Sequence, residues 1–188
     1  MQGDGAVVVP ASLDVDLDAL WTSWLHNRHA YNAATYGPLL KREAIAAQLK
    51  EENRWEAESG LSLMAIDLQR AATTRTAFYE QIVSMFVTAG GDFDLLALPT
   101  AQVWPFDVEQ RWPAEVAGRA MDTYHRWMEC TLYATYAGLP AISMPAGFSS
   151  AGLPAGIQLI GAPLADVDVL RCASGYERLI DDFSVGMA

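Results

Sequence analysis

Residues 137–161 read AGLPAISMPAGFSSAGLPAGIQLIG, and this stretch carries the strongest indication of the architecture. Two apolar runs within it, Ala141–Met144 and Ala155–Ile160, each follow a Gly-Leu-Pro corner. Short apolar runs between turn signals are typical of buried strands. The pattern therefore predicts two strands, joined by the turn-rich connector Gly147–Pro154.

Two earlier runs are also predicted to be strands. Asp94–Thr100 lies between the turn signal Gly90-Gly91 and a Pro-punctuated loop, which indicates a strand buried on both faces. The β-branched run Val7–Val9, closed by Pro10, is likewise expected to be a buried strand.

Helices are predicted between and after these strands, because apolar residues recur there at helical spacing. The predicted segments are Leu17–Leu25, the more polar stretch 41–53, Met64–Phe86, about residues 115–136, and a last helix that begins near Asp166. Gly37-Pro38 is expected to break the first of these patterns. This order of helices and strands predicts the α/β class.

The composition predicts one globular domain over residues 1–188. Apolar residues make up 52% of the chain and charged residues 19%, which is a globular balance. The 23 acidic residues against 12 basic ones give a formal net charge of −11. A chain of this charge is repelled by phosphate backbones and by anionic membrane surfaces, so we expect neither a nucleic-acid nor a membrane partner.

Cysteine usage and hydropathy predict a cytoplasmic protein. Cys130 and Cys172 are the only cysteines, so a disulfide framework is not expected. No apolar run has the length of a membrane span, and residues 1–10 do not resemble a signal peptide.

Between Phe93 and Glu177 the chain resembles the amidase-signature family. The matching residues, in order, are Asp94–Thr100, Trp104–Phe106, Ala137–Phe148, Gly152–Gly161, Asp166, Leu170 and Tyr176-Glu177. The order and spacing of these fragments make the resemblance specific. Thr135 is a departure, because family members usually carry Asn at that position before the Gly-Leu-Pro corner.

The resemblance implies the carboxy-terminal part of an amidase domain, with a mixed sheet flanked by helices. Residues 1–90 would form its mainly helical portion and residues 91–188 its α/β portion. The implied reaction is the hydrolysis of linear carboxamides through an acyl-enzyme on Ser, with a Lys that acts through a second Ser.

In the family those catalytic groups lie on a Gly/Ser-rich segment and a Lys upstream of the part that this chain matches. Lys41 and Lys50 have no such segment beside them. We therefore assign no catalytic residue, cofactor or metal, and we expect the isolated chain to be inactive.

The loop after the Asp94–Thr100 strand holds the candidate pocket residues Gln102, Val103, Trp104 and Phe106. Open α/β sheets bind ligands beyond the carboxyl ends of their strands, and in the resembling enzymes this loop helps to wall the substrate pocket. Trp104 and Phe106 could equally pack the loop onto the core, and both interpretations stay open. Gln158, within a predicted strand, is expected to bond backbone groups and not substrate.

Several other polar groups are weighed against ordinary structural roles. Ser149 and Ser150 lie in a segment that resembles a Gly/Ser signature, but turns favour these residues for local backbone reasons. His26 and His29 could share a helix face, but no further ligand cluster is evident. His125 and Cys130 are five residues apart on a predicted helix, so their side chains are expected to point to different faces.

Three functional hypotheses follow from these residues and from the resemblance. The chain could be part of an amidohydrolase that takes a small amide substrate once an amino-terminal part is supplied. It could be a subunit that completes an active site with a partner chain, or a non-catalytic α/β binding module. Strands that are apolar on both faces also predict a homo-oligomer, which would bury them together with the Trp21/Trp24 helix.

Overall fold

The computed structural model describes residues 5–180, which form two compact units. One unit comprises Asp14–Gln81, and the other comprises the residues up to Leu13 together with those from Ile82 onward. No helix among residues 5–180 is long and apolar enough to cross a bilayer.

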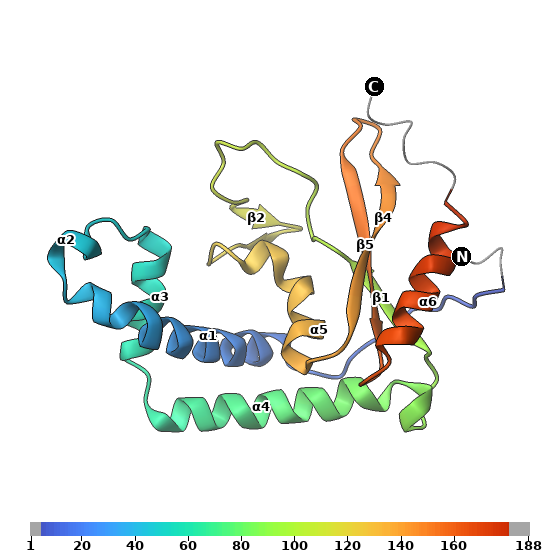
Figure 1. Ribbon diagram of the computed structural model, residues 1–188, viewed down its shortest axis with the longest axis horizontal. Helices are drawn as coiled ribbons and strands as arrows, with labels where there is room; N and C mark the ends of the chain where they lie inside the picture. The colour runs from blue at the N-terminus through green and yellow to red at the C-terminus, as the bar shows by residue number, and fades with distance from the viewer. Residues whose placement is uncertain (1–4, 181–188) are drawn as a thin grey trace. The chain divides into compact units, whose positions relative to one another are not determined.

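The first unit is helical. Its helices are α1 (Leu17–Leu40), α2 (Glu43–Ala46), α3 (Glu51–Leu61) and the greater part of α4 (Ala65–Ser84) (Figure 1). The Asp16 carboxylate caps α1 by accepting hydrogen bonds from the backbone N–H groups of Asp18 (3.0 Å) and Ala19 (2.9 Å). The expected break at Gly37-Pro38 is wrong, because α1 continues through Pro38 to Leu40.

Close packing of α1 against α3 forms the centre of this unit. A Cβ placed on Gly60 of α3 would lie 1.9 Å from the carbonyl oxygen of His29, so the two backbones approach as only a glycine permits. The buried Glu56 carboxylate accepts hydrogen bonds from Asn32 (2.6 Å) and from the guanidinium of Arg28. Close backbone packing and the hydrogen bonds of the Glu56 carboxylate therefore both hold α1 against α3.

The second unit contains a three-stranded sheet. β1 (Leu95–Pro99) and β4 (Ala141–Phe148) flank the central β5 (Pro154–Gly161), so the order is β1-β5-β4 (Figure 1). Both pairings are antiparallel, and Gln158 of β5 lies opposite Leu98 on one side and Ser143 on the other. The predicted α/β class and these three strands are confirmed. The sheet is antiparallel where a mixed sheet was expected. A short turn joins β4 to β5 as a hairpin, which accounts for the direction of that pair.

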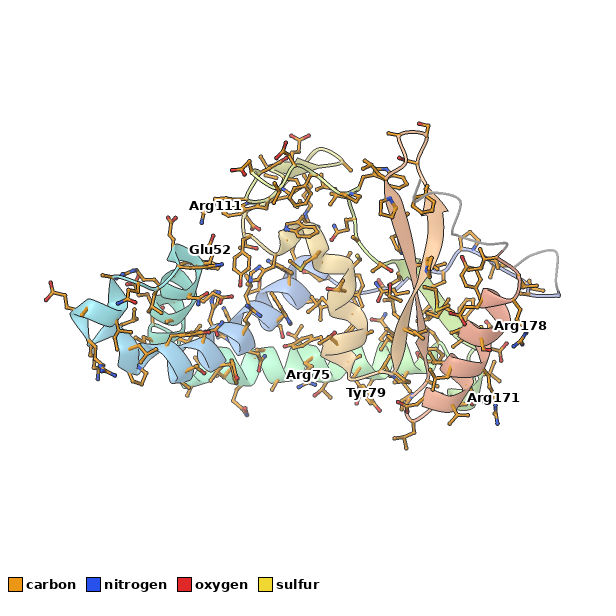
Figure 2. The ribbon with its side chains drawn as sticks, turned by 45° about the horizontal axis from the view of Figure 1, so that its top comes forward. Glu52, Arg75, Tyr79, Arg111, Arg171 and Arg178 are labelled. Carbon is orange, nitrogen blue, oxygen red and sulfur yellow. The ribbon has the colours of Figure 1, made fainter. Side chains whose placement is uncertain are left out.

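Helices lie along both sides of this sheet (Figure 1). On one side, α6 (Asp166–Glu177) completes a core of Met144, Leu159 and Ala173, against which Ile142, Ile157, Cys172 and Tyr176 pack. Arg171 and Arg178 project from the opposite surface of α6 (Figure 2). On the other side lie the 3₁₀ helix η3 (Arg126–Thr131) and the short α5 (Leu132–Ala137).

The predicted helix over residues 115–136 is wrong in its first half. That half contains a hairpin of β2 (Glu115–Val116) and β3 (Arg119–Ala120), and only η3 and α5 follow as helix. Ala117 (φ 51°) and Gly118 (φ 81°) both have left-handed backbone, which the two-residue turn of such a hairpin requires.

The predicted strand Val7–Val9 is also wrong. The backbone of residues 7–9 is not in a strand, and Val7 is 88% exposed. A β-branched run favours an extended backbone, but a strand also needs a neighbour whose backbone groups can pair with it.

Between α4 and β1, the 3₁₀ helix η2 (Val87–Ala89) ends at Gly90, whose left-handed backbone (φ 88°) agrees with the stop predicted there.

Candidate functional site

The loop that follows β1 is tied to η3 at two points. The side-chain oxygen of Gln102 accepts a hydrogen bond from the backbone N–H of Cys130, at 3.1 Å. The ring of Phe106 meets that of Trp127 edge to face, with 5.3 Å between ring centroids. Of the four predicted pocket residues, Gln102 and Phe106 thus contact η3.

Trp104 lies between these two anchored residues and is 48% exposed. Its neighbour Val103 is half-buried. An indole that is half-exposed on a loop with fixed ends offers a flat apolar surface and one N–H donor to a ligand. Phe106 therefore packs the loop onto η3, whereas the exposed ring of Trp104 can line a substrate pocket.

Gln158 holds the base of this loop. Its side chain is in the centre of the sheet and the residue is only 7% exposed. The side-chain nitrogen donates to the carbonyl oxygens of Pro99 (2.9 Å) and Cys130 (3.0 Å). The prediction that Gln158 bonds backbone groups is confirmed.

A buried ion cluster lies on η3, and the sequence did not predict it. Glu129 and Arg126 are each 4% exposed, and Arg126 Nε lies 3.1 Å from Glu129 Oε2. Arg119, from β3, approaches the same oxygen at 3.3 Å. The spacing of Arg126 and Glu129 by three residues was the one signal in the sequence, and such pairs are usually solvated.

The electrostatics around η3 disfavour thiol chemistry. Burial raises the pKa of the Cys130 thiol, so the nucleophilic thiolate is not favoured. The ring of His125 bonds the Thr123 hydroxyl, with Nδ1 and Oγ1 2.8 Å apart. Burial, with a further contribution from the Glu129 charge, raises the pKa of Tyr133 to about 12.

Ser149 and His29 make structural contacts. The hydroxyl of Ser149 accepts hydrogen bonds from Ala151 N–H (3.2 Å) and Leu153 N–H (3.1 Å), as expected for a residue that shapes the β4–β5 turn. His29 is buried and meets Trp55 edge to face at 4.8 Å. Within residues 5–180, no group of three or more His, Cys, Asp or Glu residues could hold a metal ion.

Comparison with known sequences gives one family over most of the chain. A family model described as Amidase matches residues 9–170. The chain is 37% identical over 114 residues to a glutamyl-tRNA(Gln) amidotransferase subunit from Myxococcus xanthus, covering 61% of this chain and 21% of that protein. It is 42% identical over 93 residues to the protein of the same name from Moorella thermoacetica, covering 50% and 18%.

Solved structures show the same fold at lower sequence identity. A bacterial aryl acylamidase of the amidase-signature family matches 90% of this chain and 35% of its own, with a TM-score of 0.78 and 22% identity. A crystal structure described as an amidase matches 89% of this chain and 37% of its own, with a TM-score of 0.75 and 20% identity. The chain thus spans about a fifth of the curated relatives and about a third of the solved ones.

Proposed function

Because this chain belongs to the amidase family, we propose that it forms the carboxy-terminal portion of an amidohydrolase and contributes one wall of its amide-binding pocket. The wall is the loop of Gln102, Val103, Trp104 and Phe106. The observation that carries this proposal is the half-exposed indole of Trp104, between two residues that are fixed on η3.

An aromatic side chain with restricted freedom suits the recognition of a planar amide. Its face provides apolar contact area at a small entropic cost, because the loop is already anchored before a ligand arrives. The anchoring distances at Gln102 and Phe106 support a pocket wall that is largely preformed.

The bond-breaking groups are proposed to come from another segment. The reaction needs a nucleophile with a base beside it, and we assign neither role to a residue of this chain. The Ser149 hydroxyl accepts backbone hydrogen bonds, and the Cys130 thiol is favoured in its neutral form. We therefore propose that a serine nucleophile and its lysine reach this wall from an amino-terminal amidase segment, on the same polypeptide or on a partner chain.

Assembly with other chains is supported by the relatives. The Myxococcus xanthus and Moorella thermoacetica proteins are, by name, subunits of an amidotransferase. We propose that this chain likewise works in an assembly, with a small amide as the substrate that donates or loses its nitrogen.

The test has two stages. The 188-residue chain is first treated with a serine-directed fluorophosphonate probe. We expect no labelling, because the activated serine is proposed to lie on another segment. Stoichiometric labelling at Ser149 or Ser150 would contradict this and would place a nucleophile in the β4–β5 turn.

In the second stage, the chain is co-expressed with the part of the Myxococcus xanthus relative that precedes the matched region, and ammonia release from amides is measured. Trp104→Ala should raise KM several-fold with a smaller effect on kcat, because it removes binding area. Val108→Ala is the matched control, since Val108 is 92% exposed in the same loop and its loss should change nothing. Equal kinetics for the two variants would remove Trp104 from the pocket and leave the loop a packing role only. An assembly that releases no ammonia would favour the non-catalytic binding module.

A further inference from the structure

The backbone of Cys130 is held by two glutamine side chains from different parts of the chain. Gln102, in the loop after β1, accepts the Cys130 N–H at 3.1 Å. Gln158, in β5, donates to the Cys130 carbonyl oxygen at 3.0 Å. A backbone N–H and a backbone C=O of one η3 residue are thus both satisfied by side chains that belong to the sheet and its loop.

Gln158 also connects η3 to the point where the loop begins. Its side-chain nitrogen carries two hydrogens, and the second hydrogen bond is accepted by the Pro99 carbonyl oxygen at 2.9 Å. One buried amide group therefore fixes the end of β1 and the backbone of Cys130 at the same time. Polar groups buried in this way define a single arrangement, because any displacement leaves them unsatisfied.

η3 provides contacts that can hold the loop in one position. The ion pair of Arg126 with Glu129 is buried within it, and Trp127 presents its ring edge to Phe106. The loop thus meets η3 through Gln102 before Trp104 and through Phe106 after it.

We propose that Gln102 and Gln158 are positioning residues that set the place of Trp104 in the amide-binding wall, acting through the backbone of Cys130. This inference rests on the proposed function, and it adds a positioning role for Gln102 to its place in the wall. Gln102 supplies a hydrogen-bond acceptor and Gln158 supplies donors. Replacement by methionine therefore removes an acceptor at position 102 and donors at position 158.

The main test uses Gln102, because its side chain is exposed and its replacement does not threaten the core. Gln102→Met removes the acceptor at similar size, whereas Gln102→Glu keeps an oxygen that can accept the Cys130 N–H. Amide hydrogen exchange on the intact chain should be on the order of fivefold faster at Cys130 in Gln102→Met, from the net worth of one hydrogen bond. Gln102→Glu should exchange at the wild-type rate.

Loop peptides that cover Val103 to Phe106 should follow the same pattern as the Cys130 amide. Equal exchange in Gln102→Met and the wild type would overturn the proposal, as would an equal increase in Gln102→Met and Gln102→Glu, because the acceptor would then be irrelevant. Gln158→Met is a second variant, expected to loosen both Cys130 and the end of β1.

Kinetics of the co-expressed assembly distinguish positioning from general stability. Gln102→Met should raise KM more than Gln102→Glu does, because only Glu keeps an acceptor for the Cys130 N–H, and in both variants kcat should change less than KM. A loss of kcat with unchanged KM would contradict a role at the binding wall. The hydrogen-exchange measurement on the isolated chain needs no enzymatic activity. Failure of the positioning role of the two glutamines can therefore be told apart from failure of the proposed amidase function.

Discussion

The hydroxyl oxygens of Thr100 and Ser143 lie 2.8 Å apart, which links the end of β1 to β4 across the central strand β5. Thr100 also donates its backbone N–H to the carbonyl oxygen of Gly156 in β5, at 2.9 Å. A Cβ on residue 156 would lie 2.7 Å from Thr100 Oγ1 and 3.0 Å from Thr100 Cβ. The hydroxyl pair therefore depends on the absence of a side chain at Gly156.

Replacing Gly156 with alanine should lower the free energy of unfolding by about 1–3 kcal/mol, the usual range for overpacking. The added methyl group meets the branched side chain of Thr100, which must move away from Ser143. Urea denaturation of Gly156→Ala and the wild type would measure the difference.

A double-mutant cycle would establish whether displacement of Thr100 is the cause. Ser143→Ala alone should cost up to about 1 kcal/mol, because the hydroxyl pair is exposed. In the Gly156→Ala background the same substitution should cost almost nothing, since the pair is already broken. Additive effects would show that the methyl group acts elsewhere.

Removal of the Glu129 carboxylate should be among the most damaging single changes in the second unit. Glu129→Ala leaves the guanidinium of Arg126, which is 4% exposed, without that counter-charge in the interior. Loss of one partner of a buried pair costs about 3–5 kcal/mol. Thermal unfolding monitored by circular dichroism would measure it.

Arg119 provides the matched control for this cluster. Its side chain approaches the same Glu129 oxygen but is 44% exposed, so water screens the pair. Arg119→Ala should therefore cost less than about 1 kcal/mol. Similar losses for Glu129→Ala and Arg119→Ala would mean that burial does not govern the strength of this cluster.

The strands of the sheet could be predicted because their apolar runs lie between strong turn signals. Leu95–Pro99 and the two strands that surround the Ser149 turn all occur where the pattern indicated. The pairing directions did not follow from the pattern, because an apolar run carries no information about which neighbour it will meet. Val7–Val9 has the same composition but does not form a strand.

The sequence pointed to the loop after β1 as the candidate site, but not to the contacts that hold this loop in place. The resemblance and the position after β1 pointed to Gln102 and Trp104, and the burial of Gln158 gave its backbone role. The hydrogen bonds that meet at Cys130 join segments 28 residues apart in each direction. Contacts of that kind leave no periodic signal in the sequence, since they depend on the tertiary placement of η3.

Tyr133 should make stability fall at alkaline pH. Burial is the main reason that its pKa is raised from 10.0 to about 12. Between about pH 10 and pH 12 the unfolded chain loses this proton while the folded chain keeps it, so the free energy of unfolding decreases as pH rises. Below about pH 10 both states are protonated, and the contribution is constant.

Comparison with Tyr133→Phe would isolate this effect. The pKa values of Cys130 and Cys172 are also raised by burial, so they change stability in the same direction. The difference between wild type and Tyr133→Phe should therefore change as the pH rises from about 10 toward about 12, while the contribution of Cys172 cancels. Parallel urea midpoints for the two proteins across that range would rule out Tyr133 as the titrating group.

Two helical glycines should respond in opposite directions to replacement by alanine. In α3, a Cβ on Gly60 would lie 1.9 Å from the His29 carbonyl oxygen and 2.7 Å from Ala33 Cβ. α1 and α3 could not keep their present separation, and neither a backbone carbonyl nor an alanine can rotate away. Gly60→Ala should destabilise the helical unit by about 3 kcal/mol or more.

Gly175 in α6 is the counterpart, because a Cβ there would meet only the Arg178 guanidinium, at 3.9 Å. That distance is an ordinary van der Waals contact with the end of a flexible side chain. The remaining effect is the helix propensity of alanine, which exceeds that of glycine by about 0.5–1 kcal/mol. Gly175→Ala should therefore raise the urea midpoint, whereas Gly60→Ala lowers it under the same conditions. A loss of stability in Gly175→Ala would show that α6 requires a glycine at that position for a reason other than space.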